Sequence, residues 1–168
     1  MAKHNDLCGI NSAHNTQIIY EDTRNKVGKH DNVRKYCEAH GIELVRIALP
    51  IGDYALPDGT VAIDTKRNLS EVCTNLMTRN DSARFWREVR RAHAEGIKLY
   101  ILVEHGGQIH TIRDVPLWSS QYSRVSGRRL LVEMCRVEAA YGVIWRFCSK
   151  RSTGKQIVEL LNGKENKN

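Results

Sequence analysis

A short hairpin pattern with an acid on each side of its turn constrains this chain most. Pro57-Asp58-Gly59 interrupts two extended runs, and Asp-Gly is a preferred two-residue hairpin turn. With that turn, the register of the hairpin places Asp53 directly opposite Asp64. Opposed residues on antiparallel strands have Cα atoms about 4.5–5.5 Å apart, which is close enough for both carboxylates to bind one divalent cation.

The second strand of this hairpin separates polar from packing positions. Side chains alternate along a strand, so Lys66 lies on the same side as Asp64. The other side takes Val61, Ile63 and Thr65. Two like charges opposite each other destabilise a sheet, which argues for a bound cation, for Lys66 as counter-ion, or for both. The same spacing also fits an exposed hairpin with ordinary surface acids, so the rest of the chain has to decide.

Strand-like and helix-like segments alternate along the rest of the sequence. Besides the hairpin, strands are expected over 17–20, 43–48, 98–103, 108–112 and 143–148. Helices are expected over 31–40, 69–77, 82–95, 126–141 and 152–161, with Asp31 and Ser126 as N-caps. This order predicts an α/β fold, a mixed β-sheet flanked by helices on both faces. We expect a single domain over 16–162, with a flexible tail at 1–15 and a loose tail at 163–168.

The charge of the chain favours an anionic partner. Its formal net charge is +7, and Arg84, Arg87 and Arg91 share one face of the helix expected over 82–95. Such a face can bind phosphates, although an ordinary solvated helix face has the same pattern. The basic excess would also offset the repulsion between the acidic pair and a polyanion. These charges do not distinguish DNA from RNA.

The five cysteines are dispersed along the chain and include no CxxC pair. We therefore expect free and mostly packed thiols in a reducing compartment. There is no run of about 18 apolar residues and no signal-peptide pattern, so an intracellular protein of the cytoplasm, nucleoid or nucleus is expected, with no membrane partner.

Four stretches of the sequence form one ordered set. They are Ile18–Arg24, Leu49–Tyr54, Ile63–Lys66, and Arg84 with the Glu104 that ends an aliphatic segment. In this order and approximate spacing they resemble the nuclease domain of the XPF family, which are structure-specific DNA endonucleases of the restriction-endonuclease-like superfamily. The resemblance covers a little over half of the chain and implies a restriction-endonuclease-like core.

The chain departs from the family pattern at several positions. Asp64 stands where the family usually has Glu, which shortens the reach by one methylene but keeps a ligand. Asn25 replaces a Glu, Thr65 an Arg and Ala83 a Gly. The metal ligands are therefore retained, and the other departures fall on residues that would position the substrate.

The opposed acids and the resemblance together give each candidate residue a role. Asp53 and Asp64 would hold Mg²⁺ or Mn²⁺, with the carbonyl of Thr65 as a third ligand. Lys66 would orient or help to deprotonate the attacking water and would neutralise charge that develops on the phosphate. Asp22 matches an acidic position of the family and would provide a further ligand, directly or through water.

The arginines complete the expected site. The resemblance implies that Arg24 and Arg84 contact phosphate near the cut, whereas Glu104 is a weaker candidate that also reads as the polar end of a strand. The sequence thus predicts a metal-dependent DNA endonuclease, and the resemblance implies action on branched or flapped DNA and assembly as a homodimer or heterodimer. A catalytically silent DNA-binding or subunit-pairing module of the same fold stays open as the alternative, and so does cleavage of RNA. The intact Asp53, Asp64 and Lys66 favour the enzyme.

Overall fold

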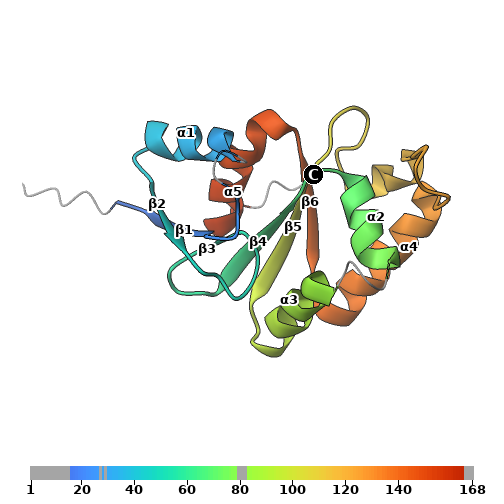
Figure 1. The fold of residues 1–168 in the computed structure, drawn as a ribbon, viewed down its shortest axis with the longest axis horizontal. Helices are drawn as coiled ribbons and strands as arrows, with labels where there is room; N and C mark the ends of the chain where they lie inside the picture. The colour runs from blue at the N-terminus through green and yellow to red at the C-terminus, as the bar shows by residue number, and fades with distance from the viewer. Residues whose placement is uncertain (1–15, 27, 29, 79–82, 165–168) are drawn as a thin grey trace, which may run out of the picture.

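The computed structural model describes residues 16–26, 28, 30–78 and 83–164 (Figure 1). Within these residues one sheet of six strands has the order β2-β1-β3-β4-β5-β6. The strands are β1 Ile18–Asp22, β2 Glu43–Ile47, β3 Tyr54–Ala55, β4 Val61–Lys66, β5 Lys98–Glu104 and β6 Ile144–Cys148. β3 is antiparallel to β1 and β4, and the remaining neighbours are parallel. The mixed sheet is confirmed.

Helices cover both faces of this sheet, as predicted. The α-helices are α1 Asp31–Ala39, α2 Leu69–Met77, α3 Ala83–Ala94, α4 Gly127–Tyr141 and α5 Thr153–Leu161. Two 3₁₀ helices, η1 Ile112–Leu117 and η2 Lys150–Ser152, lie between them in the chain. α1 and α5 lie together on one face of the sheet, and α2, α3 and α4 lie on the other (Figure 1).

The side-chain alternation of the central strands explains this two-sided packing. Ile63 of β4 and Tyr100 of β5 belong to the core beneath α1 and α5. Their neighbours Ala62 and Ile101 belong to the core beneath α2, α3 and α4. Burial on both faces is typical of parallel strands. Asp64 and Lys66 continue the Ala62 side, so they emerge on the α2–α4 face where β4 ends.

Local sequence signals set several helix boundaries. The Ser126 hydroxyl accepts a hydrogen bond from the Arg129 N–H at 3.3 Å, which confirms the predicted cap of α4. The sequence suggested Asp31 as the N-cap of α1, and the structure shows that this is wrong. His30 takes that position without a side-chain cap bond, and Asp31 lies in the first turn. An acid there still favours the helix, because it faces the positive end of the helix dipole.

The strand predicted over 108–112 is wrong. β5 already pairs with β4 on one edge and with β6 on the other, so it has no free edge for a hairpin partner. The Asp114 carboxylate instead accepts hydrogen bonds from the N–H groups of His110 and Thr111 at 3.0 and 2.9 Å. These bonds turn the chain into η1, whose Val115 is buried.

Free and mostly packed thiols are found at the described cysteine positions. Cys37, Cys73 and Cys148 are free and buried, and Cys135 is free and exposed. Burial raises the pKa of the Cys37 thiol to about 11, and the charges of nearby Glu21 and Glu38 add to the shift. Cys8 and the tail predicted over 1–15 lie outside the described residues, as does 165–168. In the described part of the chain, no helix is long and apolar enough to span a membrane.

Candidate active site

The hairpin has the predicted register, but that register does not continue to Asp53. Tyr54 pairs with Ile63 and Ala55 with Ala62. In a regular antiparallel ladder the N–H and the carbonyl of one residue face the same neighbouring strand, and the Asp53 carbonyl accepts from the Asp22 N–H of β1 at 2.9 Å. The Asp53 N–H instead donates to the carbonyl of Ile63 at 2.7 Å. Two residues thus face one, as in a β-bulge, and Asp53 does not stand directly opposite Asp64 in the ladder.

Gly52 makes this bulge possible. Its φ is +71°, in the left-handed region that glycine adopts at little cost. A Cβ at this position would lie 2.7 Å from the carbonyl oxygen of Ile63. The Gly52 N–H donates to Oε2 of Glu88 at 3.1 Å. The backbone before Asp53 is therefore fixed by β4 on one side and by α3 on the other.

Asp53 and Asp64 nevertheless line the same hollow, which has a volume of about 520 Å³. Both are buried, with exposed fractions of 5% and 8%. Oδ2 of Asp53 accepts a hydrogen bond from the Thr65 N–H at 3.0 Å and another from the Thr65 hydroxyl. Burial raises the pKa of Asp64 to about 6; the charge of Asp53 adds to this rise and Lys66 opposes it. A cation between the two acids would relieve their desolvation and repulsion.

Lys66 is the counter-ion of Asp64 in this structure. Its Nζ lies 2.7 Å from Oδ2 of Asp64 and 5.3 Å from the centre of the Phe85 ring. Burial lowers the pKa of Lys66, but the charge and hydrogen bond of Asp64 outweigh burial and leave it above its ordinary value. Lys66 is therefore an ammonium donor at neutral pH. This state suits neutralising charge on a phosphate better than deprotonating water.

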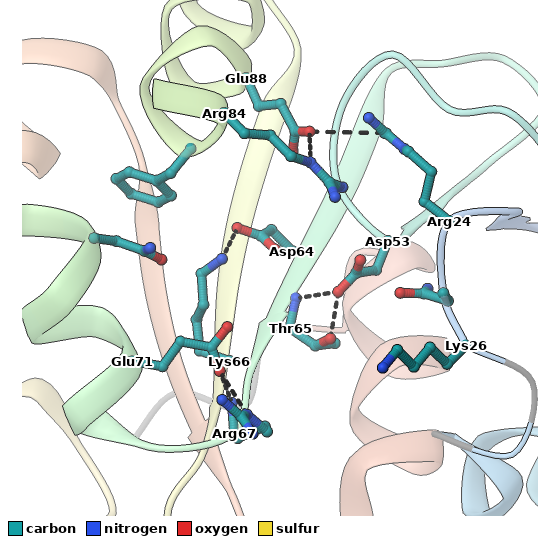
Figure 2. Close-up of a pocket in the computed structure, with 13 residues that line it drawn as sticks. Arg24, Lys26, Asp53, Asp64, Thr65, Lys66, Arg67, Glu71, Arg84 and Glu88 are labelled. Atoms are coloured by element: carbon teal, nitrogen blue, oxygen red, sulfur yellow. Dashed lines mark hydrogen bonds and ion pairs between the residues drawn. The ribbon is translucent and has the colours of Figure 1, made fainter. Parts of the chain in front are cut away.

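Arg24 and Arg84 lie on one side of the hollow, and Lys66 lies on the other, with the two acids between them (Figure 2). Nε of Arg84 lies 2.8 Å from Oε1 of Glu88. Burial lowers the pKa of Arg84, but the hydrogen bond and charge of Glu88 raise it overall. The hollow is lined by Arg24, Asn25, Lys26, Asp53, Asp64, Thr65, Lys66, Arg67, Glu71, Asn75, Arg84, Phe85 and Glu88.

Asp22 contacts both arginines and is not among the residues that line the hollow. It is fully buried. Its Oδ2 is 2.5 Å from Nε of Arg24 and 3.5 Å from Nη2 of Arg84. Its Oδ1 accepts from the Leu49 N–H at 3.4 Å. The carboxylate is thus already engaged by two cations, which suits holding the arginines better than binding a metal.

The remaining sequence candidates are spread over other surfaces. Arg87 lines a separate hollow with Arg90, between α2, α3 and α4. Arg91 is exposed and lies 3.8 Å from Glu95. The three arginines of this helix face therefore do not act as one surface, and of the three Arg84 alone lines the hollow that holds Asp53 and Asp64. Glu104 accepts a hydrogen bond from the Thr153 hydroxyl at 2.5 Å at the start of α5, which is the structural role of a polar strand end.

Sequence reasoning missed several residues of the hollow. Glu88 is buried in its wall, and its place four residues after Arg84 on a helix was the available signal. Asn25 appeared only as a departure from the family pattern. Nδ2 of Asn25 and Oδ1 of Asn75 are buried without a hydrogen-bond partner among the described residues. Both line the hollow, so they offer a donor and an acceptor to whatever fills it.

The donor set at the acids fits a hard divalent cation. In the described residues, no group of three or more His, Cys, Asp or Glu side chains is placed to hold a metal ion. The available ligands are therefore two carboxylates, with the main-chain carbonyl of Thr65 as a possible addition. Mg²⁺ is commonly bound by one or two carboxylates, with water and substrate phosphate completing its coordination. Asp53 and Asp64 meet this requirement.

Comparisons with known proteins found a matching family model and similar solved structures. A family model described as the ERCC4 domain matches residues 22–160. XPF from Aeropyrum pernix has a similar structure, with a TM-score of 0.64 and 20% identity over 89% of this chain and 66% of that one. The same protein in complex with DNA gives 0.63 and 22% over 87% and 64%. The chain thus spans less than two thirds of the length of these solved chains.

A comparison with curated protein sequences gave no match. The solved structures show that the chain shares its α/β fold with XPF from Aeropyrum pernix. The family model extends from the end of β1 to α5 and so includes the hairpin, both acids and Lys66. The chain therefore belongs to the ERCC4 domain family, which confirms the resemblance to XPF nucleases seen in its four sequence stretches.

Proposed function

We propose that this domain is a divalent-metal-dependent endonuclease that hydrolyses phosphodiester bonds in DNA. One observation carries the proposal. Two buried acids and a buried ammonium group meet in one hollow, where Lys66 Nζ lies 2.7 Å from Asp64, and two arginines border the same hollow. A packing role does not need buried charges at this density, because each one is costly to desolvate.

In this proposal each residue of the site has its own role. Asp53 and Asp64 would hold Mg²⁺ or Mn²⁺, and Thr65 orients Asp53 through two hydrogen bonds. When bound, such an ion polarises the scissile phosphate and lowers the pKa of a coordinated water. Lys66 would donate to a phosphate oxygen as charge develops there. Arg24 and Arg84 would hold the phosphate through guanidinium N–H groups that their carboxylate partners leave free.

The proposal that the substrate is DNA is based on the similar XPF structures and on the resemblance to the XPF family. A similar structure is XPF from Aeropyrum pernix in complex with DNA. The XPF resemblance extends the proposal to branched or flapped DNA and to pairing with a second subunit. The net charge of +7 supports a polyanionic substrate, since clustered positive charge binds phosphates by releasing counter-ions.

A nicking assay tests the proposed function. The purified protein is incubated with linear, flapped and four-way-junction DNA in Mg²⁺, Mn²⁺ or EDTA. We expect cleavage of a branched substrate to a 5′-phosphate and a 3′-hydroxyl in either metal, and none in EDTA. Cleavage of matched RNA substrates alone would reassign the substrate. DNA binding without cleavage of any substrate in Mn²⁺ would favour the silent module.

A further inference from the structure

Helix α3 places one carboxylate, that of Glu88, between the two parts of the site. One part is the pair of acids proposed to hold the metal, and the other is the pair of arginines proposed to bind phosphate. Glu88 is buried, and both of its oxygens are engaged. Oε2 accepts from the Gly52 N–H at 3.1 Å, while Oε1 lies 2.8 Å from Nε of Arg84 and 3.7 Å from Nη2 of Arg24. A buried carboxylate is expensive unless its partners compensate it. Here each partner belongs to a different segment of the site.

The two arginines are held by two acids rather than one. Asp22 contacts both guanidinium groups from the end of β1, at 2.5 Å for Arg24 and 3.5 Å for Arg84. Glu88 contacts the same two groups from α3, and Figure 2 shows its side chain beside Arg84 with a link to Arg24. Each of the two guanidinium groups therefore contacts both buried carboxylates. Their side chains stay 43% and 47% exposed, so N–H groups remain available to a ligand.

The hydrogen bond from the Gly52 N–H connects Glu88 to the segment that carries Asp53, one of the two acids proposed to hold the metal. Gly52 directly precedes Asp53 and packs closely against β4, because a Cβ built on it would lie 2.7 Å from the Ile63 carbonyl oxygen. The bond from the Gly52 N–H to Glu88 fixes the other side of this short segment. A shift of Glu88 would thus be passed to Asp53 and to both arginines at once.

We propose that Glu88 is a positioning residue that sets the distance between the metal-holding acids and the phosphate-binding arginines. It acts through Gly52 on Asp53 and through its ion pairs on Arg24 and Arg84. It does not bind the cation itself, since its oxygens are already taken by these donors. This inference rests on the proposed function, in which both halves must engage one phosphodiester.

The test compares Glu88→Ala with Glu88→Gln. The amide oxygen of Gln can still accept from the Gly52 N–H, whereas Ala leaves that N–H unpaired and releases both arginines. For Glu88→Ala we expect kcat to fall about 100-fold, the effect of a misplacement of about 1 Å, and KM for DNA to rise. For Glu88→Gln we expect kcat to recover to within about tenfold of wild type. Mn²⁺ affinity should fall about tenfold in Glu88→Ala and recover in Glu88→Gln, as for residues that orient metal ligands.

Glu133→Gln is the matched control. Glu133 on α4 also bridges two arginines, Arg129 at 3.4 Å and Arg136 at 2.7 Å, and it does not line the hollow. It should behave as wild type. Wild-type kcat, KM and Mn²⁺ affinity in Glu88→Ala would overturn the inference. A Gln variant with Mn²⁺ affinity as weak as that of Glu88→Ala, with a native melting temperature, would also overturn it, because its amide oxygen still accepts from the Gly52 N–H and should keep Asp53 in place.

Failure of the proposed function would give a different result. If the wild type cleaves nothing, the endonuclease proposal fails and Glu88 is judged on DNA and Mn²⁺ affinity alone. Weaker DNA binding and weaker Mn²⁺ binding in Glu88→Ala, with recovery of both in Glu88→Gln, would still support the positioning role. Unchanged affinities would refute it.

Discussion

Asp64→Asn and Lys66→Met should each lower the cleavage rate by about 10³-fold or more, while DNA affinity changes little. Asn keeps the volume of Asp64 but removes the negative charge that binds a cation, and its neutral amide oxygen is a weaker ligand for Mg²⁺ than a carboxylate. Met keeps the apolar stem of Lys66 beside Phe85 but removes the ammonium group that lies 2.7 Å from Asp64. Single-turnover cleavage and fluorescence anisotropy on the same DNA measure the two effects separately.

Lys155→Met is the control for the lysine variant. Lys155 lies on α5, is paired with Glu159 at 3.7 Å, and does not line the hollow. This variant should cleave as the wild type does. If Asp64→Asn or Lys66→Met loses binding and cleavage in equal measure, the residue has a structural role or the variant is misfolded. If both variants cleave normally, neither residue takes part in the chemistry.

Gly52→Ala should cause the largest loss of stability near the site. Its φ of +71° costs a residue with a side chain about 1–2 kcal/mol. The added Cβ would also lie 2.7 Å from the Ile63 carbonyl, which belongs to the central strand β4 and cannot give way cheaply. We expect the free energy of unfolding to fall by about 3 kcal/mol in total. Urea denaturation of the metal-free protein measures it.

Gly59→Ala separates the clash from the backbone strain. Gly59 in the hairpin turn has nearly the same φ, +70°, but a Cβ there would meet nothing within 4 Å. This variant should lose only the strain of about 1–2 kcal/mol. Equal losses in the two variants would mean that the backbone at Gly52 relaxes freely, and Asp53 would then not be rigidly placed.

Signals that act over a few residues predicted much of the fold. The Asp-Gly turn gave the pairing of Tyr54 with Ile63, and the helix pattern gave both ends of α2. Ser126 marked the start of α4 through the hydrogen bond that it accepts. In each case a side chain or turn close in sequence decides the local backbone, so the pattern carries the information.

Contacts between distant segments decided what the sequence could not. The 108–112 stretch has strand character, but both edges of β5 are taken by β4 and β6. Asp53 leaves the ladder directly after Gly52, whose N–H donates to Glu88, 36 positions away. Asp22 was expected near the metal, yet two arginines from β1's end and from α3 surround its carboxylate. The pattern of polar and apolar residues along the chain does not predict which distant side chains will contact each other.

Binding of Mn²⁺, followed by electron paramagnetic resonance during titration, tests the shared-cation site most directly. The wild type should bind a single ion, and Asp53→Asn and Asp64→Asn should each weaken that binding by more than about tenfold. Wild-type protein that binds no Mn²⁺, or variants that bind it as tightly as the wild type, would contradict a cation held between Asp53 and Asp64.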